Sequence, residues 1–140
     1  MRIFNRRASF NFELGEKIEA GIALTGPETK SVYEGKISLD EAFAKLRNGE
    51  IWLFNCHIHP YRFAETAGID PTRPRKLLLH RKEILSLEAK MKQKNLTLVP
   101  TACYTKNRKI KIELALARAK KNFEKRKKSK GMTRFDEMVL

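Results

Sequence analysis

Residues 109–117 carry the most restrictive pattern in the chain, an unbroken alternation of apolar and polar side chains. Every second position is apolar: Ile110, Ile112, Leu114 and Leu116. Charged residues occupy three positions between them: Lys109, Lys111 and Glu113. Because successive side chains of a strand point to opposite faces, this period of two predicts a strand with one buried and one solvated face. Residues 96–105 supply a preceding strand, which a turn at 106–108 joins to it.

A second hairpin is predicted around Asn48-Gly49, the dipeptide most typical of a tight two-residue turn. Residues 42–47 and 50–57 form its two strands. In the second strand the side chains divide between one face (Trp52, Phe54 and Cys56) and the other (Ile51, Leu53 and Asn55). Both faces are largely apolar, so we expect a helix to cover the outside of this wall.

The remaining segments predict one more strand and two helices. Residues 18–25 indicate a strand, in which Gly21 points to a bulge or a close backbone approach. A helix begins at Gly26-Pro27-Glu28 and stops at Gly35. A second helix spans 80–94 with a core-facing stripe of Ile84, Leu87 and Met91. Prolines stiffen the loop that precedes it, residues 60–74.

These elements predict a mainly β protein, a small antiparallel β-barrel of the oligonucleotide-binding (OB) type with short peripheral helices. At 140 residues the chain is long enough for one domain and too short for two comfortable ones. We expect residues 1–117 to form the barrel with a short N-terminal arm. Residues 118–140 should form a basic tail that is disordered when free.

Charge is distributed unevenly and indicates the partner. Residues 1–72 hold nine Lys/Arg and ten Asp/Glu, whereas residues 73–140 hold twenty-one and six. Within 116–130, eight of fifteen residues are basic and Glu124 is the only acid. Such a run repels itself in solution and gains by releasing counterions from a polyanion. A solvated tail without a fixed partner is the alternative, but the run leaves directly from a patterned strand. We therefore expect nucleic acid as the partner.

Other partners and chemistries have little support. No apolar run approaches the roughly 20 residues that span a bilayer, and the N-terminus lacks the apolar core of a secretory signal. Cys56 and Cys103 lie in apolar segments, which indicates buried reduced thiols and a cytoplasmic protein. On a strand, His57 and His59 would point to one face and Cys56 to the other, so the three side chains could not bind one metal ion. We therefore expect neither a metal site nor a cofactor. The chain lacks phosphate-binding glycine loops and paired acids at a catalytic spacing, and we predict that it is not an enzyme.

Seven ordered motifs resemble one family. They are Asn5-Arg6-Arg7-Ala8, Glu19-Ala20-Gly21-Ile22-x-Leu24-x-Gly26, Glu28-x-Lys30-Ser31-x-x-x-Gly35-Lys36, Asn48-Gly49-Glu50, Asp70-Pro71-x-Arg73-x-Arg75-Lys76-Leu77-Leu78-Leu79, Tyr104-x-Lys106-Asn107 and Lys120-Lys121-x-x-Glu124-Lys125-Arg126. Together they resemble SmpB, the family of small basic proteins that partner transfer-messenger RNA in bacteria.

The resemblance implies a ribosome-rescue factor rather than a catalyst. Its OB barrel would bind the tRNA-like domain of transfer-messenger RNA and help to deliver that RNA, charged with alanine, to stalled ribosomes. The tail would enter the empty messenger channel near the decoding centre. Elongation factor Tu and alanyl-tRNA synthetase would be indirect partners through the RNA, and the bound protein would be monomeric. A ribosomal-type structural RNA-binding protein is the alternative, and a nuclease built on His57, His59 and Asp40 ranks last.

The resemblance also implies a set of site residues. Those expected on RNA are Asn5, Arg6, Arg7, Glu19, Arg75, Lys76, Leu78 and Lys111. Those expected on the ribosome are Lys120, Lys121, Glu124, Lys125 and Arg126. Glu19 would accept a hydrogen bond from a base edge or 2′-hydroxyl, or hold Arg6 or Arg7. Leu78 is either an RNA contact or simple core, and Lys111 fits a phosphate contact.

The tail departs from the family pattern. Arg118-Ala119 stands where the family commonly has Lys-Gly, and Glu124 stands where it has Asp. Gly131 interrupts the stretch after Arg126, at a cost to a helix of about 1 kcal/mol.

Overall fold

A computed structural model describes residues 2–63 and 70–121. Nine strands and three short helices make up this part of the chain. The strands are β1 (Arg2–Phe4), β2 (Phe12–Ile22), β3 (Ile37–Ser38), β4 (Phe43–Arg47), β5 (Glu50–Phe54), β6 (His57–Ile58), β7 (Arg75–Leu78), β8 (Thr97–Lys106) and β9 (Lys109–Ala119). The helices are α1 (Arg6–Asn11), α2 (Gly26–Tyr33) and α3 (Arg81–Lys94).

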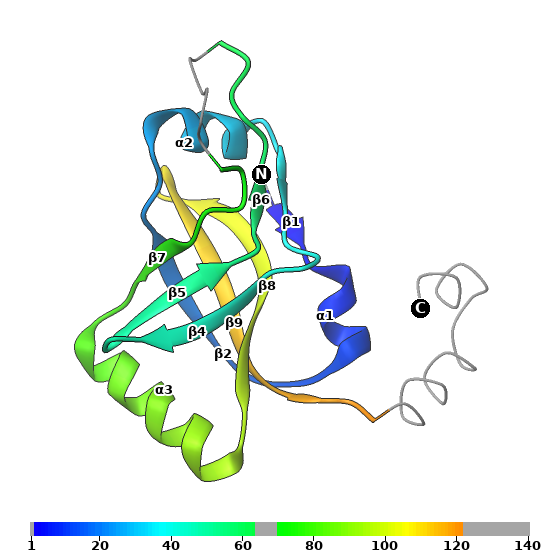
Figure 1. Ribbon diagram of the computed structural model, residues 1–140, viewed down its shortest axis with the longest axis vertical. Coiled ribbons are helices and arrows are strands. Elements are labelled where there is room, and N and C mark those ends of the chain that lie inside the picture. The colour runs from blue at the N-terminus through cyan, green and yellow to red at the C-terminus, as the bar shows by residue number, and fades with distance from the viewer. Residues whose placement is uncertain (1, 64–69, 122–140) are drawn as a thin grey trace, which may run out of the picture.

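Six antiparallel strands close into a ring of hydrogen-bonded neighbours. The main sheet has the order β1-β8-β4-β5-β7-β2-β9, and β9 also pairs with β8. The long strands β2, β8 and β9 cross behind the β4–β5 hairpin, with α2 near one end of the ring and α3 near the other (Figure 1). The predicted mainly antiparallel β architecture with short helices is confirmed.

Both predicted hairpins form with left-handed turn residues. Asn48 and Gly49 have φ of 53° and 75°, and Asn107 and Arg108 have 51° and 63°. These values suit the primed turns whose twist matches that of paired strands. Strand β5 ends three residues earlier than predicted, because Asn55 also has a positive φ of 57°. Cys56 therefore lies in the core rather than beside the half-buried Trp52.

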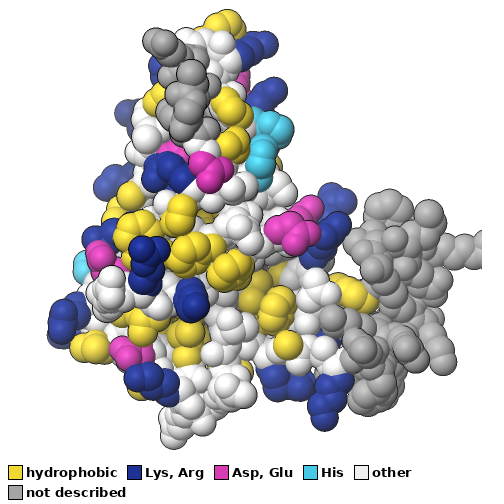
Figure 2. Space-filling view, in the orientation of Figure 1, with side chains coloured by type: hydrophobic (Ala, Val, Ile, Leu, Met, Phe, Trp, Pro, Cys, Tyr) yellow, Lys and Arg dark blue, Asp and Glu magenta, His cyan; other side chains and the backbone are white. Residues whose placement is uncertain are grey.

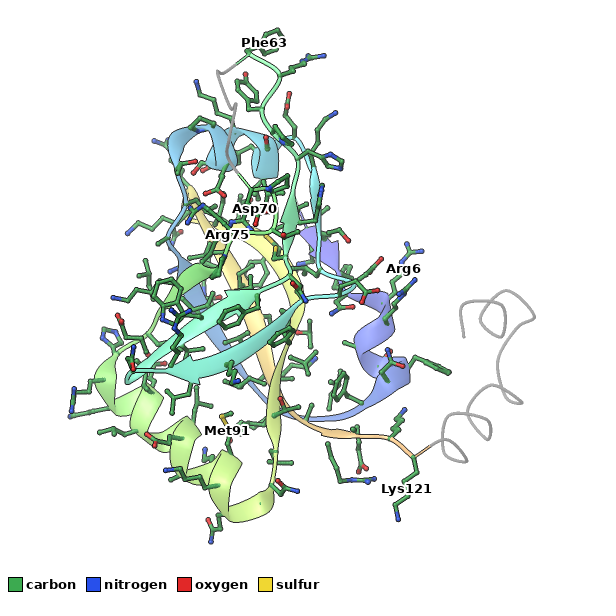
Figure 3. All side chains as sticks on the ribbon, viewed as in Figure 1. Arg6, Phe63, Asp70, Arg75, Met91 and Lys121 are labelled. Carbon is green, nitrogen blue, oxygen red and sulfur yellow. The ribbon has the colours of Figure 1, made fainter. Side chains whose placement is uncertain are left out.

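The core follows the alternation of β9. Its four large apolar side chains, Ile110, Ile112, Leu114 and Leu116, are buried inside the ring. Ala115 and Ala117, on the face predicted to be solvated, are also buried, so that prediction is wrong for this end of the strand. Leu87 of α3 is buried against them, and Ile84 and Met91 pack beside it as predicted. Figure 3 shows Met91 pointing from α3 toward the ring. Both cysteines are free and buried, and burial raises the pKa of each thiol to about 12.

The outer face of the β4–β5 hairpin differs from the prediction. Phe43 is exposed, and Trp52 and Phe54 are only half-buried. Among the described residues, α1, α2 and α3 lie elsewhere on the ring (Figure 1). The expected helical cover is therefore wrong. The reason is that α3 buries its single apolar stripe against the end of the ring and has none left for the hairpin.

The N-terminal arm and the root of the tail are ordered parts of the body. Strand β1 pairs with β8, and the Asn5 side-chain Nδ2 donates to the Pro100 carbonyl at 2.8 Å. Strand β2 begins at Phe12, six residues earlier than predicted, and its pairing with β9 shifts register between Leu14 and Lys17. Strand β9 continues to Ala119, beyond the expected end at 117. Glu124, Lys125 and Arg126 lie outside the described residues.

A buried ion pair joins helix α2 to strand β7. The Arg75 guanidinium has no solvent exposure and donates from Nε to Glu28 Oε2 at 2.8 Å. It also donates to the carbonyls of Cys56, at 2.6 Å, and Pro71, at 2.9 Å. Arg73 donates to the same carboxylate from outside, at 3.1 Å from Nε to Oε2. Figure 3 shows Arg75 in the interior, close to Asp70.

Glu28 also caps its own helix. The Thr25 backbone N–H donates to Glu28 Oε1 at 3.0 Å, and the Glu28 N–H donates to Thr25 Oγ1 at 3.3 Å. Burial acts to raise the pKa of Glu28, but hydrogen bonds from Arg73, Thr25 and Arg75 outweigh it and hold the pKa below the usual 4.5. Glu28 therefore stabilises the fold above pH 4.5, and this stability is lost as the pH falls through the lowered value.

We predict that Arg75→Met destabilises the protein by about 3–5 kcal/mol, because it leaves the buried Glu28 carboxylate with a single charged partner, Arg73, among the described residues. Arg73→Met, at a partly exposed position, should cost about 1 kcal/mol or less. Urea unfolding followed by circular dichroism measures both. Equal losses for the two variants would contradict the assignment of Arg75 as the central partner.

Candidate nucleic-acid interface

Four neighbouring strands align a row of side chains on the outside of the ring. Tyr104 of β8 pairs with Lys111 of β9, Lys111 pairs with Gly21 of β2, and Gly21 pairs with Leu78 of β7. Two grooves, of about 550 Å³ and 330 Å³, run beside this row and share Gly21, Leu78 and Lys111. We call the row and its two grooves the β7–β2–β9 face.

Gly21 allows the row to close up. A Cβ atom built on it would lie 3.2 Å from Leu78 Cβ, closer than such atoms normally pack. Gly21 therefore accommodates the side chain of Leu78 rather than a neighbouring backbone, and the register shift of β2 lies away from it, between Leu14 and Lys17. Leu78 and Lys111 flank this glycine on the two neighbouring strands, and both line the two grooves.

Leu78 is the exposed apolar residue of this face. The residue is 51% exposed, which rules out the simple core position that its sequence context allowed. Burial alternates along β7, with Arg75 and Leu77 inside and Lys76 and Leu78 outside. Lys76 forms an ion pair with Glu50 at the tip of the hairpin, and both line the larger groove.

Glu19 is held as a carboxylate beside the row. The Tyr104 hydroxyl donates to its Oε2, and Lys106 Nζ lies 3.6 Å from the same oxygen. The hydrogen bond from Tyr104 lowers the pKa of Glu19 most, and the nearby charges of Lys106 and Lys111 add to it, while burial opposes them. Burial, followed by the Glu19 hydrogen bond, raises the pKa of Tyr104 to about 12.

The expected contact of Glu19 with Arg6 or Arg7 is wrong. Arg7 pairs instead with Glu41 at 2.8 Å, and its helix α1 lies across the ring from β7 (Figure 1). Arg6 points outward from the same helix (Figure 3). Tyr104 was missed because only the pairing of β2 and β8 with the same strand, β9, brings it to Glu19.

Two of the expected RNA contacts lie in the interior. Arg75 is fully buried in the ion pair with Glu28, and Asn5 is buried against β8. These two side chains hold loops and strands in place rather than line a surface. The surface residues of the predicted set thus divide between the β7–β2–β9 face, with Glu19, Lys76, Leu78 and Lys111, and helix α1, with Arg6 and Arg7.

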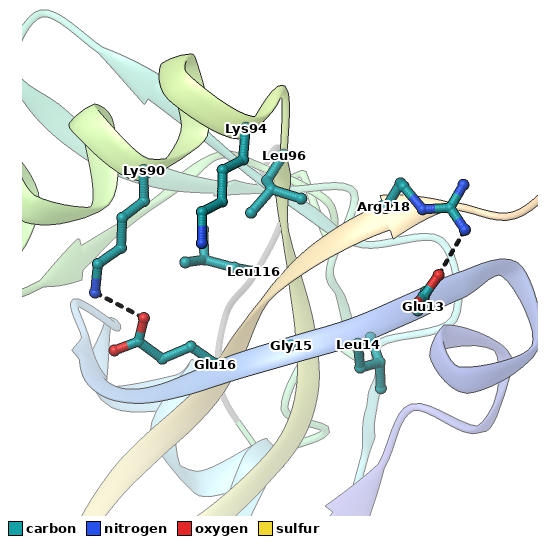
Figure 4. A pocket seen from close by; sticks show the side chains of 9 residues that line it. All are labelled: Glu13, Leu14, Gly15, Glu16, Lys90, Lys94, Leu96, Leu116 and Arg118. Atoms are coloured by element: carbon teal, nitrogen blue, oxygen red, sulfur yellow. Dashed lines mark hydrogen bonds and ion pairs between the residues drawn. The ribbon is translucent and has the colours of Figure 1, made fainter.

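A third groove, of about 320 Å³, lies beside the root of the tail (Figure 4). Lys90, Lys94 and Arg118 line it together with Glu13 and Glu16. Glu16 pairs with Lys90 at 2.7 Å, and Glu13 pairs with Arg118. The next basic residue of the tail, Lys120, donates from Nζ to the Ser9 carbonyl at 2.8 Å, while Lys121 is exposed. The two acids offset two of the three cations, so this groove is less positive than its basic residues suggest.

A ring of antiparallel strands with an apolar and cationic outer row, on a chain of net charge +14, defines a small basic RNA-binding protein. In the described residues no helix is both long and apolar enough to cross a membrane. The model of the family described as SmpB protein matches residues 2–138, and the chain belongs to this family. It is an RNA-binding protein rather than an enzyme.

Named relatives agree with this assignment. An SsrA-binding protein of Sulfurihydrogenibium sp. is 52% identical over 132 residues, covering 93% of this chain and 87% of the relative. One from Carboxydothermus hydrogenoformans is 48% identical, covering 87% of this chain and 82% of the relative. A solved structure described as "tmRNA-SmpB: a journey to the center of the bacterial ribosome" matches with a TM-score of 0.70 and 46% identity, over 86% of this chain and 85% of that one.

We predict that Gly21→Val weakens binding of transfer-messenger RNA by roughly tenfold, since the added methyls force Leu78 out of the row at a packing cost of about 1–3 kcal/mol. Gly26→Val is the control, because nothing lies within 4 Å of a Cβ added there. Filter binding measures the affinity, and thermal unfolding shows whether each variant is folded. Unchanged affinity in folded Gly21→Val would contradict the role given to this glycine.

Proposed function

We propose that this protein binds the tRNA-like domain of transfer-messenger RNA through its β7–β2–β9 face and helps to deliver that RNA to stalled ribosomes in the bacterial cytoplasm. The observation that supports this proposal best is the row Leu78–Gly21–Lys111 with the ionised Glu19 beside it. The row joins apolar, cationic and acceptor groups on one rigid surface. We further propose that the six-stranded ring is an OB-type barrel, a fold suited to such binding.

Each exposed group of the face suits a different part of RNA. Lys111 fits a backbone phosphate, and the side chain of Leu78 fits the apolar face of a sugar or base. Glu19 accepts a hydrogen bond from a 2′-hydroxyl or base edge, because Tyr104 keeps it ionised and oriented. Lys76 can exchange Glu50 for a phosphate. A surface with these three kinds of group would bind a folded RNA with matching groups in preference to any other polyanion.

The tail would act on the ribosome rather than on the RNA. Lys120 and Lys121 leave the body on the side away from β7, and the basic stretch continues from them with Glu124, Lys125 and Arg126. A cationic segment of this length gains by releasing counterions from ribosomal RNA that lines a narrow channel. We propose that it probes the empty messenger channel, with the protein monomeric and elongation factor Tu and alanyl-tRNA synthetase as indirect partners through the RNA.

The proposed face is tested by Lys111→Ala and Leu78→Ala, each of which should weaken binding of the tRNA-like domain by about tenfold. Lys92→Ala is the control, since Lys92 is an exposed lysine on α3. Filter binding at physiological salt should compare transfer-messenger RNA with an ordinary tRNA. Equal and weak binding of both RNAs by the unaltered protein would favour a ribosomal-type structural protein instead.

The proposed tail is tested by combining Glu124→Ala with Lys125→Ala. Affinity for transfer-messenger RNA should stay within about twofold, because six or more other basic side chains near the tail remain. Tagging of incomplete peptides on stalled ribosomes should be abolished. A large loss of affinity for the free RNA would show that the tail belongs to the RNA-binding surface.

A further inference from the structure

The outer face of the β4–β5 hairpin carries aromatic rings that no helix of the described residues covers. Phe43 and Phe54 face each other across the two strands, with ring centroids 5.4 Å apart and planes 18° from parallel. Phe43 is 41% exposed. Trp52 lies two residues from Phe54 on the same face and is half-buried. Three rings thus share one outward face and form an aromatic strip along the hairpin.

Cations surround this strip. Trp52 pairs with Lys45 on one side and with Lys76 on the other, so a lysine lies on each neighbouring strand. The Arg47 guanidinium carbon is 5.9 Å from the centre of the Trp52 ring. Glu50 is the one acid on the outward side of β4 and β5, and it pairs with Lys76. Figure 2 shows hydrophobic side chains with Lys and Arg among them over this part of the ring.

We propose that this surface, the hairpin face formed by Phe43, Lys45, Arg47, Trp52 and Phe54, binds unpaired nucleotides of RNA. Exposed rings offer a stacking surface to any base, and cations between them meet the phosphates that join successive bases. A protein partner would need acidic groups opposite Lys45 and Arg47, whereas RNA supplies a negative charge at every nucleotide. The proposal goes beyond the β7–β2–β9 face, because it adds a second RNA site on the other side of strand β7.

Trp52 is the only tryptophan in the chain, so its fluorescence reports on the hairpin face alone. The full chain should be titrated with an unstructured RNA octamer while Trp52 emission is recorded. Stacking of a base on or beside the indole should quench the emission in a saturable way. Emission that stays constant when the octamer is bound would overturn the proposal. So would emission that changes with protein concentration without RNA, because the face would then pair with a second copy.

The residues are tested by the double variant Phe43→Ala with Lys45→Ala. Its matched control is Leu85→Ala with Lys92→Ala, which also removes one exposed apolar residue and one exposed lysine, from α3. Anisotropy of a labelled octamer should show roughly tenfold weaker binding for the first variant and about twofold or less for the control. Equal losses would mean that binding follows net charge alone, and the proposal would be wrong.

Two larger RNAs then distinguish the source of the nucleotides. Quenching by the tRNA-like domain assigns them to transfer-messenger RNA, whereas quenching only by deproteinised small-subunit ribosomal RNA assigns them to the ribosome. Either result supports the proposal, and quenching by neither RNA overturns it. The octamer titration tests the hairpin face without transfer-messenger RNA. If the protein proved not to prefer transfer-messenger RNA, the result of this titration would still stand.

Discussion

The buried pair of Glu28 and Arg75 is the interaction on which the functional surface depends. It connects the start of α2 to the first residue of β7 and, through two carbonyls, to the chain around Cys56 and Pro71. Strand β7 has only four residues and pairs with its neighbours at two positions each. Such a short strand needs a further anchor, and Arg75 provides it. Leu78, three residues on, is therefore held in a defined place on the outside.

The buried side of β7 stabilises the fold, and its exposed side lines the grooves. Successive side chains alternate between the two sides. Arg75 and Leu77 point inward to the ion pair and the core, while Lys76 and Leu78 point outward to the grooves. A one-residue slip would exchange the two sets and bury Lys76. The same alternation places Glu19 and Gly21 on the outside of β2 with Ala20 buried between them. Two short stretches thus set the character of the β7–β2–β9 face.

Local sequence patterns were sufficient to predict the elements whose structure depends mainly on residues close in the chain. The Asn48-Gly49 turn and the stripe on α3 formed as predicted, and β9 alternates as predicted up to Leu114, because turn geometry and side-chain period act within a few residues. The early start of β2 and the break at Asn55 were missed. Long-range pairing with β9 extends β2 over a stretch with little alternation, and a positive φ at a single asparagine leaves no periodic signal.

The sequence by itself determined the family, the mainly β character of the fold and the basic character of the second half of the chain, because ordered motifs, side-chain period and charge are properties of the residue order. It did not reveal the short strands β1, β3, β6 and β7. The tertiary structure decided which motif residues reach the surface. It buried Arg75 and Asn5, exposed Leu78, brought Tyr104 rather than an arginine to Glu19, and left Trp52 half-exposed. Burial and contact depend on which strands become neighbours and on where the apolar stripe of α3 packs. Neither can be predicted from a local sequence pattern.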